Sequence, residues 1–195
     1  MASYKRDSRD LTPLLLAELS LLLIVMSMCS TNIAEAHKKP KKLSFFMFVA
    51  VQNNSFLENP KGQFTSVLSG EAPVSPQQFA FGNLHTFDNP LSKTMSLANP
   101  ADSVGRVQGW YGNCGQSTLT LCLTQTFAYN DSIYSGSFSL LGSGVATDPV
   151  KYAAIVGGTG DFAFCRGVAE QSRVFNAFVN SEETSWFHYN VTFKF

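Results

Sequence analysis

The sequence predicts an all-β domain, either a closed barrel or a sandwich. Short apolar or alternating segments are separated by clusters of Gly, Pro, Asn and Asp, and no long 3.6-residue periodicity appears. The chain has 17 phenylalanines, all of which follow residue 36. Eight or nine short strands in one domain are typical of barrels and sandwiches, and a barrel of about eight strands can hold one small ligand.

Nine segments carry the strand pattern. The expected breaks between them contain prolines such as Pro90 and Pro100, whose missing amide donor does no harm outside a sheet. The expected strands are Leu43–Val51, Phe64–Ser69, Phe79–Phe87, Val104–Tyr111, Thr118–Ala128, Ile133–Leu141, Phe162–Ala169, Arg173–Val179 and Ser185–Phe195.

The last segment has the clearest alternation. Its odd positions carry Phe187, Tyr189, Val191, Phe193 and Phe195, and its even positions are mostly polar. Successive side chains of a strand point to opposite faces, so one face is expected to pack and the other to meet water or a partner.

The first 36 residues resemble a signal peptide. Lys5, Arg6 and Arg9 form a basic start, an apolar run covers Leu19–Met28, and Ala34-Glu35-Ala36 fits a signal-peptidase site. A membrane helix needs about 20 apolar residues, more than this run has. We therefore expect cleavage after Ala36, secretion of residues 37–195 as one domain, and no membrane anchor after cleavage.

The charge of the mature chain excludes a nucleic-acid-binding protein. It carries 11 Lys or Arg against 10 Asp or Glu, and four of the cations lie in the leader 37–42. The remaining body is slightly acidic, whereas a nucleic-acid-binding domain carries a basic face. We expect the leader to be solvated, with contact to an anionic wall polymer as the alternative.

The cysteines and histidines suggest no metal or cofactor. Cys122 and Cys165 lie in strand-like segments and are expected to be buried, whereas Cys114 is either a free thiol or paired with another chain. No His/Cys cluster has metal-ligand spacing.

Three Asn-x-Ser/Thr acceptors are expected to be glycosylated after export: Asn53, Asn130 and Asn190.

Two glycine-containing segments are more specific than composition. Ile155–Ala169 reads IVGGTGDFAFCRGVA, but no Gly-Lys-Ser/Thr follows, so a phosphate loop is disfavoured. A tight connection with positive φ at one or more glycines fits better. In Gly105–Tyr111, Arg106 and Gln108 alternate with a face of small residues that allows close approach to the backbone.

These two segments resemble the VVGGTGxFxxARGxA and GRAQGxY motifs of plant dirigent proteins, and Leu43–Met47 and Tyr134–Gly142 match further family segments in order. The resemblance implies an eight-stranded antiparallel β-barrel with a central apolar pocket. It also implies export to the apoplast and a homo-oligomer, either a trimer or a dimer. Dirigent proteins bind phenoxy radicals or quinone methides derived from monolignols and steer their coupling or ring closure. A separate oxidase supplies the radical.

The chain departs from the family at two acidic positions. The family's first-strand Asp aligns with Val49, and a second acid aligns with Gly144, so the catalytic residues are unknown. The resemblance implies substrate contacts from Lys151, Arg166 and Tyr111. Asp148 or Asp161 could replace a lost acid, although Asp161 fits better as a cap on its turn.

Arg166 allows two interpretations. On a face with Phe162, Phe164 and Val168 it either pairs with a carboxylate or points into the barrel and holds a phenolic oxygen.

Three functions remain open from the sequence. The first is a non-oxidising auxiliary that fixes the stereochemistry of monolignol radical coupling, because orientation in an apolar cavity suffices for that step. The second is a cyclase or dehydratase acting on a quinone methide, which the missing general acids disfavour. The third is a wall or defence protein that binds phenolics without chemistry.

Overall fold

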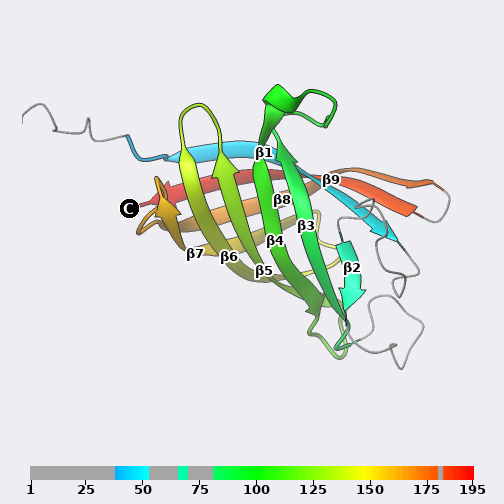
Figure 1. Ribbon diagram of the computed structural model, residues 1–195. Helices are drawn as coiled ribbons and strands as arrows, with labels where there is room; N and C mark the ends of the chain where they lie inside the picture. Colours follow the sequence, from blue (N-terminus) through cyan, green and yellow to red (C-terminus); the bar gives the residue numbers. More distant parts are fainter. Residues whose placement is uncertain (1–37, 53–65, 70–80, 180–181) are drawn as a thin grey trace, which may run out of the picture. The chain divides into compact units, whose positions relative to one another are not determined.

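The computed structural model describes residues 38–52, 66–69, 81–179 and 182–195, and these form an all-β barrel (Figure 1). The prediction of an eight-stranded antiparallel barrel is confirmed: eight long strands close on themselves, with a ninth short one between two of them. The elements are β1 Lys42–Gln52, β2 Ser66–Ser69, β3 Leu84–Ser92, the 3₁₀ helix η1 Pro100–Asp102, β4 Ser103–Asn113, β5 Thr120–Asn130, β6 Ser135–Val145, β7 Val150–Gly160, β8 Arg166–Val179 and β9 Glu182–Lys194.

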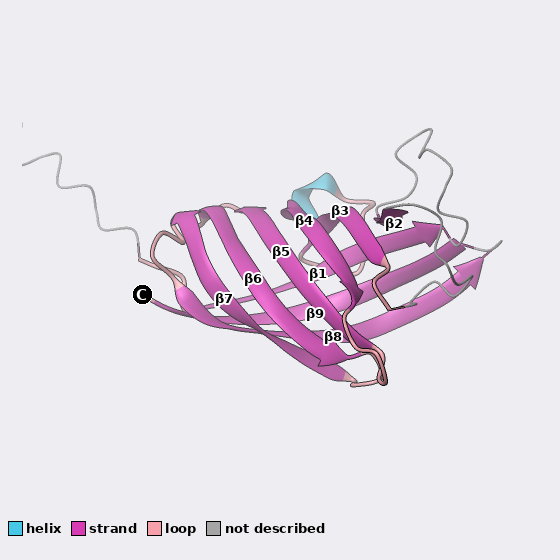
Figure 2. Cartoon of the chain, turned by 90° about the horizontal axis from the view of Figure 1, so that it is seen from below, coloured by secondary structure: helices cyan, strands magenta, loops and turns pink. Residues whose placement is uncertain are grey.

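Neighbouring strands run antiparallel, and β9 closes the barrel against β1 over the whole length of β1. The short β2 pairs antiparallel with β3 and touches β1 in parallel at one position. Strands β1, β8 and β9 extend past the others at the end where β2 lies, as both views show (Figures 1 and 2).

Phenylalanine rings fill the opposite end of the interior, near the C-terminus. Phe45, Phe127 and Phe138 are fully buried, and the last two stack with ring centroids 4.8 Å apart. Phe162 and Phe193 each lie about 5.1 to 5.4 Å from a neighbouring ring in the same group. The alternation expected for the last strand is confirmed for Tyr189, Val191 and Phe193, which are buried. Phe195, expected on the same packed face, lies after the end of β9 and is exposed, and Trp186 on the other face is buried.

The glycine-rich segment differs from the prediction. Val150–Gly160 is strand β7, which the sequence analysis missed because its glycines suggested a turn. The turn lies at residues 161–165, so the expected strand Phe162–Ala169 begins only at Arg166. It continues without a break to Val179, with a bulge between Arg173 and Phe175. Positive φ occurs at Gly160, as expected for one of the glycines, and also at Phe164.

Strand β3 lies later in the chain than predicted. It begins at Leu84 and runs to Ser92, so Pro90 lies inside a strand and its expected place between strands is wrong. On the side away from β4, the pairing with β2 ends at Phe87 and the pairing with β1 begins at Leu91. Pro90 lies in this gap between the two pairings. A proline is tolerated there because no neighbouring strand on that side needs a hydrogen bond from its backbone nitrogen.

The cysteine prediction is right only for Cys165, and the expectation that Cys114 is free or paired with another chain is wrong. Cys165 is fully buried, as expected, but Cys114 and Cys122 form a disulfide. They lie near the two ends of the turn that joins β4 to β5, with Cα atoms 5.9 Å apart, a separation that a disulfide can bridge.

The small face of β4 is explained by its neighbour. Gly105 and Gly109 turn inward, and a Cβ at either position would collide with a carbonyl of β5, from Ala128 or Thr124. The group that approaches this face closely is therefore the backbone of the next strand.

The expected signal peptide, residues 1–36, lies outside the described residues. No helix among residues 38–52, 66–69, 81–179 and 182–195 is long and apolar enough to span a bilayer.

Replacing Phe138 by Ala should lower the free energy of unfolding by about 3–5 kcal/mol, because the change leaves a cavity among stacked rings. Urea denaturation measures the loss. Ile133→Ala is the control, since Ile133 is 57% exposed and should change stability by no more than about 0.5 kcal/mol. Equal losses in the two variants would contradict the assignment of the core.

Candidate functional site

The half of the interior away from the phenylalanine rings is polar. Alternation along the strands turns a group of polar side chains inward there, next to apolar neighbours such as Val49 and Phe187. We call this group the polar end of the interior; it consists of Gln125, Lys151, Gln171, Arg173, Glu183, Ser185 and Tyr189.

Tyr189 lies at the centre of a short hydrogen-bonded chain. Its hydroxyl donates to Gln125 Oε1 at 3.0 Å and accepts from Gln171 Nε2 at 2.6 Å. The residue is 1% exposed, and burial raises the pKa of the phenol well above its usual range, although the two amides partly oppose the shift. Buried polar groups need such partners, and here three strands supply them.

Lys151 contributes a cation beside this chain. It lies opposite Gln171 at the start of β7, and its ammonium donates to the carbonyls of Ala146 (3.2 Å) and Asp148 (2.9 Å). Burial lowers the pKa of Lys151, the Asp148 carboxylate opposes this shift, and the Arg173 guanidinium adds to it. Lys151 and Arg173 are thus close enough to interact electrostatically.

Both positions of the missing acids belong to this half of the barrel. Val49 is buried on the inner face of β1, opposite Ser185 of β9. Gly144 is next to Lys151, because a Cβ at Gly144 would come within 3.2 Å of the lysine side chain. Val49, Gly144 and Lys151 thus face the same half of the interior, and their role in a substrate site stays a prediction.

A charged pair that the sequence did not predict lies in the same region. Arg173 Nη1 lies 3.6 Å from Glu183 Oε1, across the β8–β9 pairing. Glu183 was overlooked because the expected last strand began at Ser185. Extending the same alternation by two residues would have placed Glu183 on the inner face.

Tyr111 also faces inward, as the site prediction requires. It lies on β4 opposite His85, and the two rings stack with centroids 4.8 Å apart. His85 is 1% exposed, so this pair forms part of the wall between β3 and β4.

Arg166 is not in the interior. It is exposed on the outer face of β8, between Phe164 and Val168, which are 89% and 50% exposed. Within the described residues its guanidinium donates to the Cys165 carbonyl at 2.9 Å. The expectation that Arg166 points into the barrel is wrong, because strand β8 begins at this residue and turns it outward.

The two candidate replacement acids also lie outside the interior. Asp161 lies in the turn at residues 161–165, where its carboxylate accepts from the Ser135 amide at 2.8 Å and so joins the turn to the start of β6. Asp148 is exposed in the β6–β7 turn, where its backbone carbonyl binds Lys151. Asp148 therefore contacts the polar end through the hydrogen bond between its carbonyl and Lys151.

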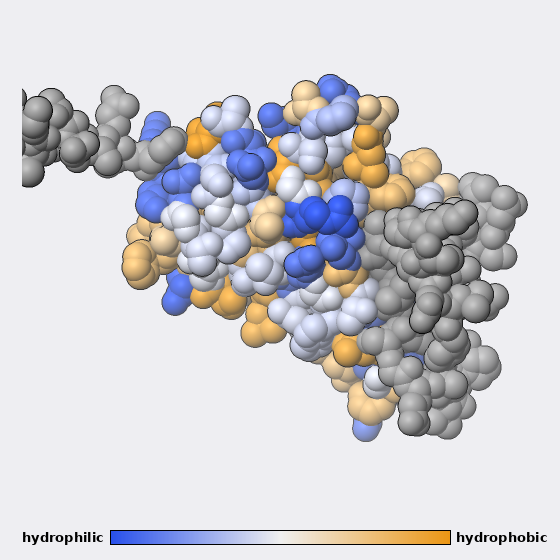
Figure 3. All heavy atoms as spheres, in the orientation of Figure 1, coloured by the Kyte–Doolittle hydropathy of each residue, from blue (hydrophilic) through white to orange (hydrophobic). Residues whose placement is uncertain are grey.

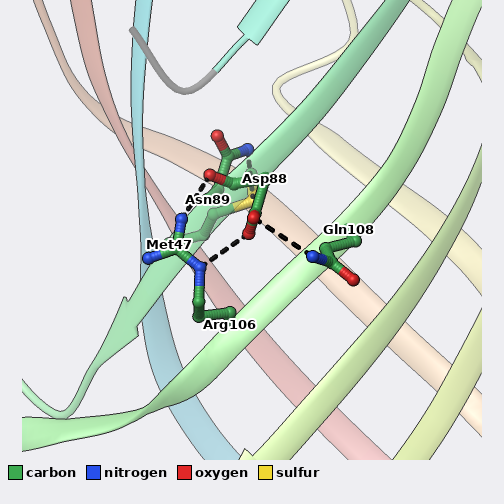
Figure 4. A network of polar contacts seen from close by, with 5 residues as sticks. All are labelled: Met47, Asp88, Asn89, Arg106 and Gln108. Carbon is green, nitrogen blue, oxygen red and sulfur yellow. Dashed lines mark hydrogen bonds and ion pairs between the residues drawn. The ribbon is translucent and has the colours of Figure 1, made fainter. Parts of the chain in front are cut away.

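The outer face of β3 and β4 carries a second polar cluster (Figure 4). Asp88 accepts from Arg106 Nε at 2.6 Å and from Gln108 Nε2 at 3.1 Å, and all three side chains point away from the barrel. The next residue, Asn89, points inward and donates to Met47 Sδ at 3.4 Å. The exposed Asp88–Arg106 pair stabilises the strand pair only modestly.

The glycosylation acceptors remain predictions. Asn130 ends β5 and Asn190 lies on the outer face of β9, and both are exposed. Asn53 lies outside the described residues.

A small pocket opens within the polar end, between β5 and β9. Its lining includes Gln125, Lys151, Gln171 and Tyr189, with Ala153 and Leu140 on the apolar side. Its volume is about 10 Å³, room for about one water molecule. A central apolar pocket of ligand size therefore stays a prediction.

Comparisons with known proteins identify the family and agree with the fold. A family model described as "Dirigent-like protein" matches residues 40–194. Dirigent protein 14 of Arabidopsis thaliana is 33% identical over 97 residues, covering 50% of this chain and 52% of the relative. Pterocarpan synthase 1 of Glycine max is 38% identical over 92 residues, covering 46% and 48%.

The chain thus spans about half the length of the curated relatives that it matches. Among solved structures, a pterocarpan synthase dirigent protein superposes with a TM-score of 0.60 at 25% identity, covering 79% of this chain and 84% of that one.

Tyr189 should make the folded protein sensitive to alkali. A raised pKa in the folded state means that stability is complete below the usual tyrosine pKa of about 10 and falls as pH rises above it. Tyr189→Phe should reduce this fall, measured as urea unfolding against pH. Identical pH dependence in parent and variant would contradict the buried, neutral phenol.

Proposed function

The chain belongs to the dirigent family, and we propose that it binds phenoxy radicals derived from monolignols such as coniferyl alcohol and imparts stereoselectivity on their coupling. A separate oxidase supplies the radicals, and the protein itself oxidises nothing. The observation that carries the proposal is the polar end of the interior, where a cation and a hydrogen-bonded tyrosine adjoin apolar side chains. We further propose that this happens outside the cell, since the first 36 residues resemble a secretion signal.

The polar end supplies what the recognition of a phenol requires. The Lys151 ammonium has three donors, two of which point at carbonyls of the β6–β7 turn, so one remains for a phenolic oxygen. Gln125 and Gln171 fix the orientation of the Tyr189 hydroxyl. Apolar neighbours such as Leu140 and Ala153 suit the aromatic ring of the ligand.

Radical coupling needs little more than this. Two radicals form a bond without a proton donor. The protein therefore needs only to hold the two radicals so that one particular face of each meets the other. The loss of acids at Val49 and Gly144 does not affect such a step.

Ring closure of a quinone methide is the second candidate. It is favoured by the similarity to proteins named pterocarpan synthases, which are synthases within the same family. Binding of phenolics without chemistry is the remaining alternative, and it predicts racemic coupling products.

We also propose that the barrel forms a homo-oligomer, a trimer or a dimer, through the outer face of β6 to β8. Leu141 and Val168 flank Ala154 across three adjacent strands and are 58% and 50% exposed, and Tyr152 nearby is 61% exposed. Hydrophobic residues also gather along the lower edge of the face in Figure 3. Large apolar patches are rare on monomers, so a second copy is the expected cover.

Light scattering at micromolar concentration tests the oligomer. The parent should have two or three times the mass of one chain, and Val168→Glu should shift it toward the monomer. Ile133→Glu, which changes an exposed apolar residue in the β5–β6 turn, should leave the mass unchanged. A monomeric parent would contradict the proposal.

Coupling of coniferyl alcohol by a one-electron oxidant tests the main function. Addition of the parent protein should produce an enantiomeric excess without raising the rate of oxidation. Lys151→Met should weaken monolignol binding about tenfold or more, because a hydrogen bond to a charged group is lost. The Arg166→Leu variant should bind monolignol and set the stereochemistry of coupling like the parent, since Arg166 lies on the outer face. Racemic product with the folded parent would refute the function.

A further inference from the structure

A carboxylate reaches the interior next to the position where the family acid is missing. Glu183 of β9 follows the same inward alternation as Ser185, Phe187 and Tyr189, and the β1–β9 pairing is unbroken. Its side chain is 16% exposed. The register places Val49 opposite Ser185 and Val51 opposite Glu183, so Glu183 is the diagonal neighbour of Val49.

The contacts that orient Glu183 within the described part of the chain are made to one carboxylate oxygen. Arg173 Nη1 lies 3.6 Å from Oε1, too far for a hydrogen bond but close enough for charge attraction. The Asn176 amide is best satisfied with its nitrogen donating to the same Oε1 at 3.0 Å and to Ser185 Oγ at 2.8 Å. Both contacts are to Oε1, so Oε2 is the oxygen that a substrate would meet.

The charges nearby complete a reactive arrangement. Lys151 lies opposite Gln171, Arg173 is the next inward residue of β8 after Gln171, and Arg173 in turn lies 3.6 Å from Glu183. A carboxylate and two cations therefore share the polar end, on strands β7, β8 and β9. Such a group can accept a proton at one point and stabilise a developing negative charge at another.

We propose that Glu183 is the general base of a ring closure, in which a hydroxyl of a bound quinone methide adds to the methide carbon of the same molecule. This inference rests on the proposed phenolic site and names a second reaction there. Glu183, supplied by β9, stands in for the carboxylate that β1 lacks at Val49.

The step is an isomerisation. Glu183 Oε2 takes the proton of the attacking hydroxyl as its oxygen forms a bond to the methide carbon. The electron pair of the exocyclic C=C bond moves into the ring, which becomes aromatic, and the carbonyl oxygen becomes a phenolate. Lys151 and Arg173 stabilise this phenolate, which then takes a proton from water, while Glu183 releases its proton to water. No oxidant or reductant is consumed.

A purely structural role for the Arg173–Glu183 pair predicts different behaviour. A structural pair would affect stability and leave the ratio of products unchanged. The 3.6 Å separation and the 53% exposed Arg173 side chain indicate a weak pair, whose loss costs little stability.

The test uses the full chain and a para-quinone methide with a tethered hydroxyl, prepared from the phenol with silver oxide and freed of oxidant. In water this compound divides between ring closure and addition of water. The parent should raise the share of cyclic product and give it an enantiomeric excess. Glu183→Gln should remove most of this rate enhancement, about 10²-fold or more, as expected for loss of a general base.

Two further variants give the test a matched control and a rescue. Glu170→Gln removes a carboxylate from the outer face of neighbouring β8 and should close the ring like the parent. Val49→Asp in the Glu183→Gln background restores a carboxylate on the adjacent inward position and should recover part of the closure. Melting temperatures of all variants show that they fold, and Glu183→Asp provides a gentler change if Glu183→Gln does not.

The outcomes separate this inference from the proposed function. A parent that steers radical coupling but does not accelerate ring closure would overturn the inference alone. Closure at the parent rate in folded Glu183→Gln would overturn it as well. A parent that neither binds monolignol nor steers coupling would overturn the proposed function first. Loss of closure in Glu183→Gln, with coupling stereochemistry retained, supports both.

Discussion

The packing of phenylalanine rings at one end of the barrel is the constraint on which the rest of the structure depends. Phe45, Phe127 and Phe138 are fully buried there and pack against one another and against the rings of Tyr129 and Tyr189. A closed barrel has one interior, so the polar side chains that line its pocket, such as Gln125, Lys151 and Gln171, lie beyond these rings toward the other end. The division between a packed half and a polar half follows directly, and it determines where chemistry can occur.

The polar half depends on the longest strands. Strands β8 and β9 extend past their neighbours, and the bulge between Arg173 and Phe175 re-aims the side chains at that end. As a result, Arg173 and Glu183 join Lys151 and Tyr189 around the interior. The proposed base, Glu183, would then supply from β9 a carboxylate that β1 and β6 do not carry at Val49 and Gly144.

The sequence predicted the fold well because its alternation and its family motifs agreed. The last strand was correct because apolar and polar side chains differ sharply from Phe187 to Phe193. Strand β7 was missed because Gly157, Gly158 and Gly160 mimic a turn, although two of them lie in extended backbone. Arg166 was misplaced for the same reason, since its face depends on where β8 begins. The Cys114–Cys122 pairing depends on the β4–β5 turn geometry, which spacing alone does not specify.

A crystal structure with coniferyl alcohol bound tests the central claim most directly, that the polar end of the interior is the phenolic site. The account predicts the phenolic oxygen within hydrogen-bond distance of Lys151 Nζ, with the ring against Leu140 and Ala153. It also predicts that the phenylalanine end stays closed. Ligand bound on the outer face beside Arg166, with the interior unchanged, would contradict the account.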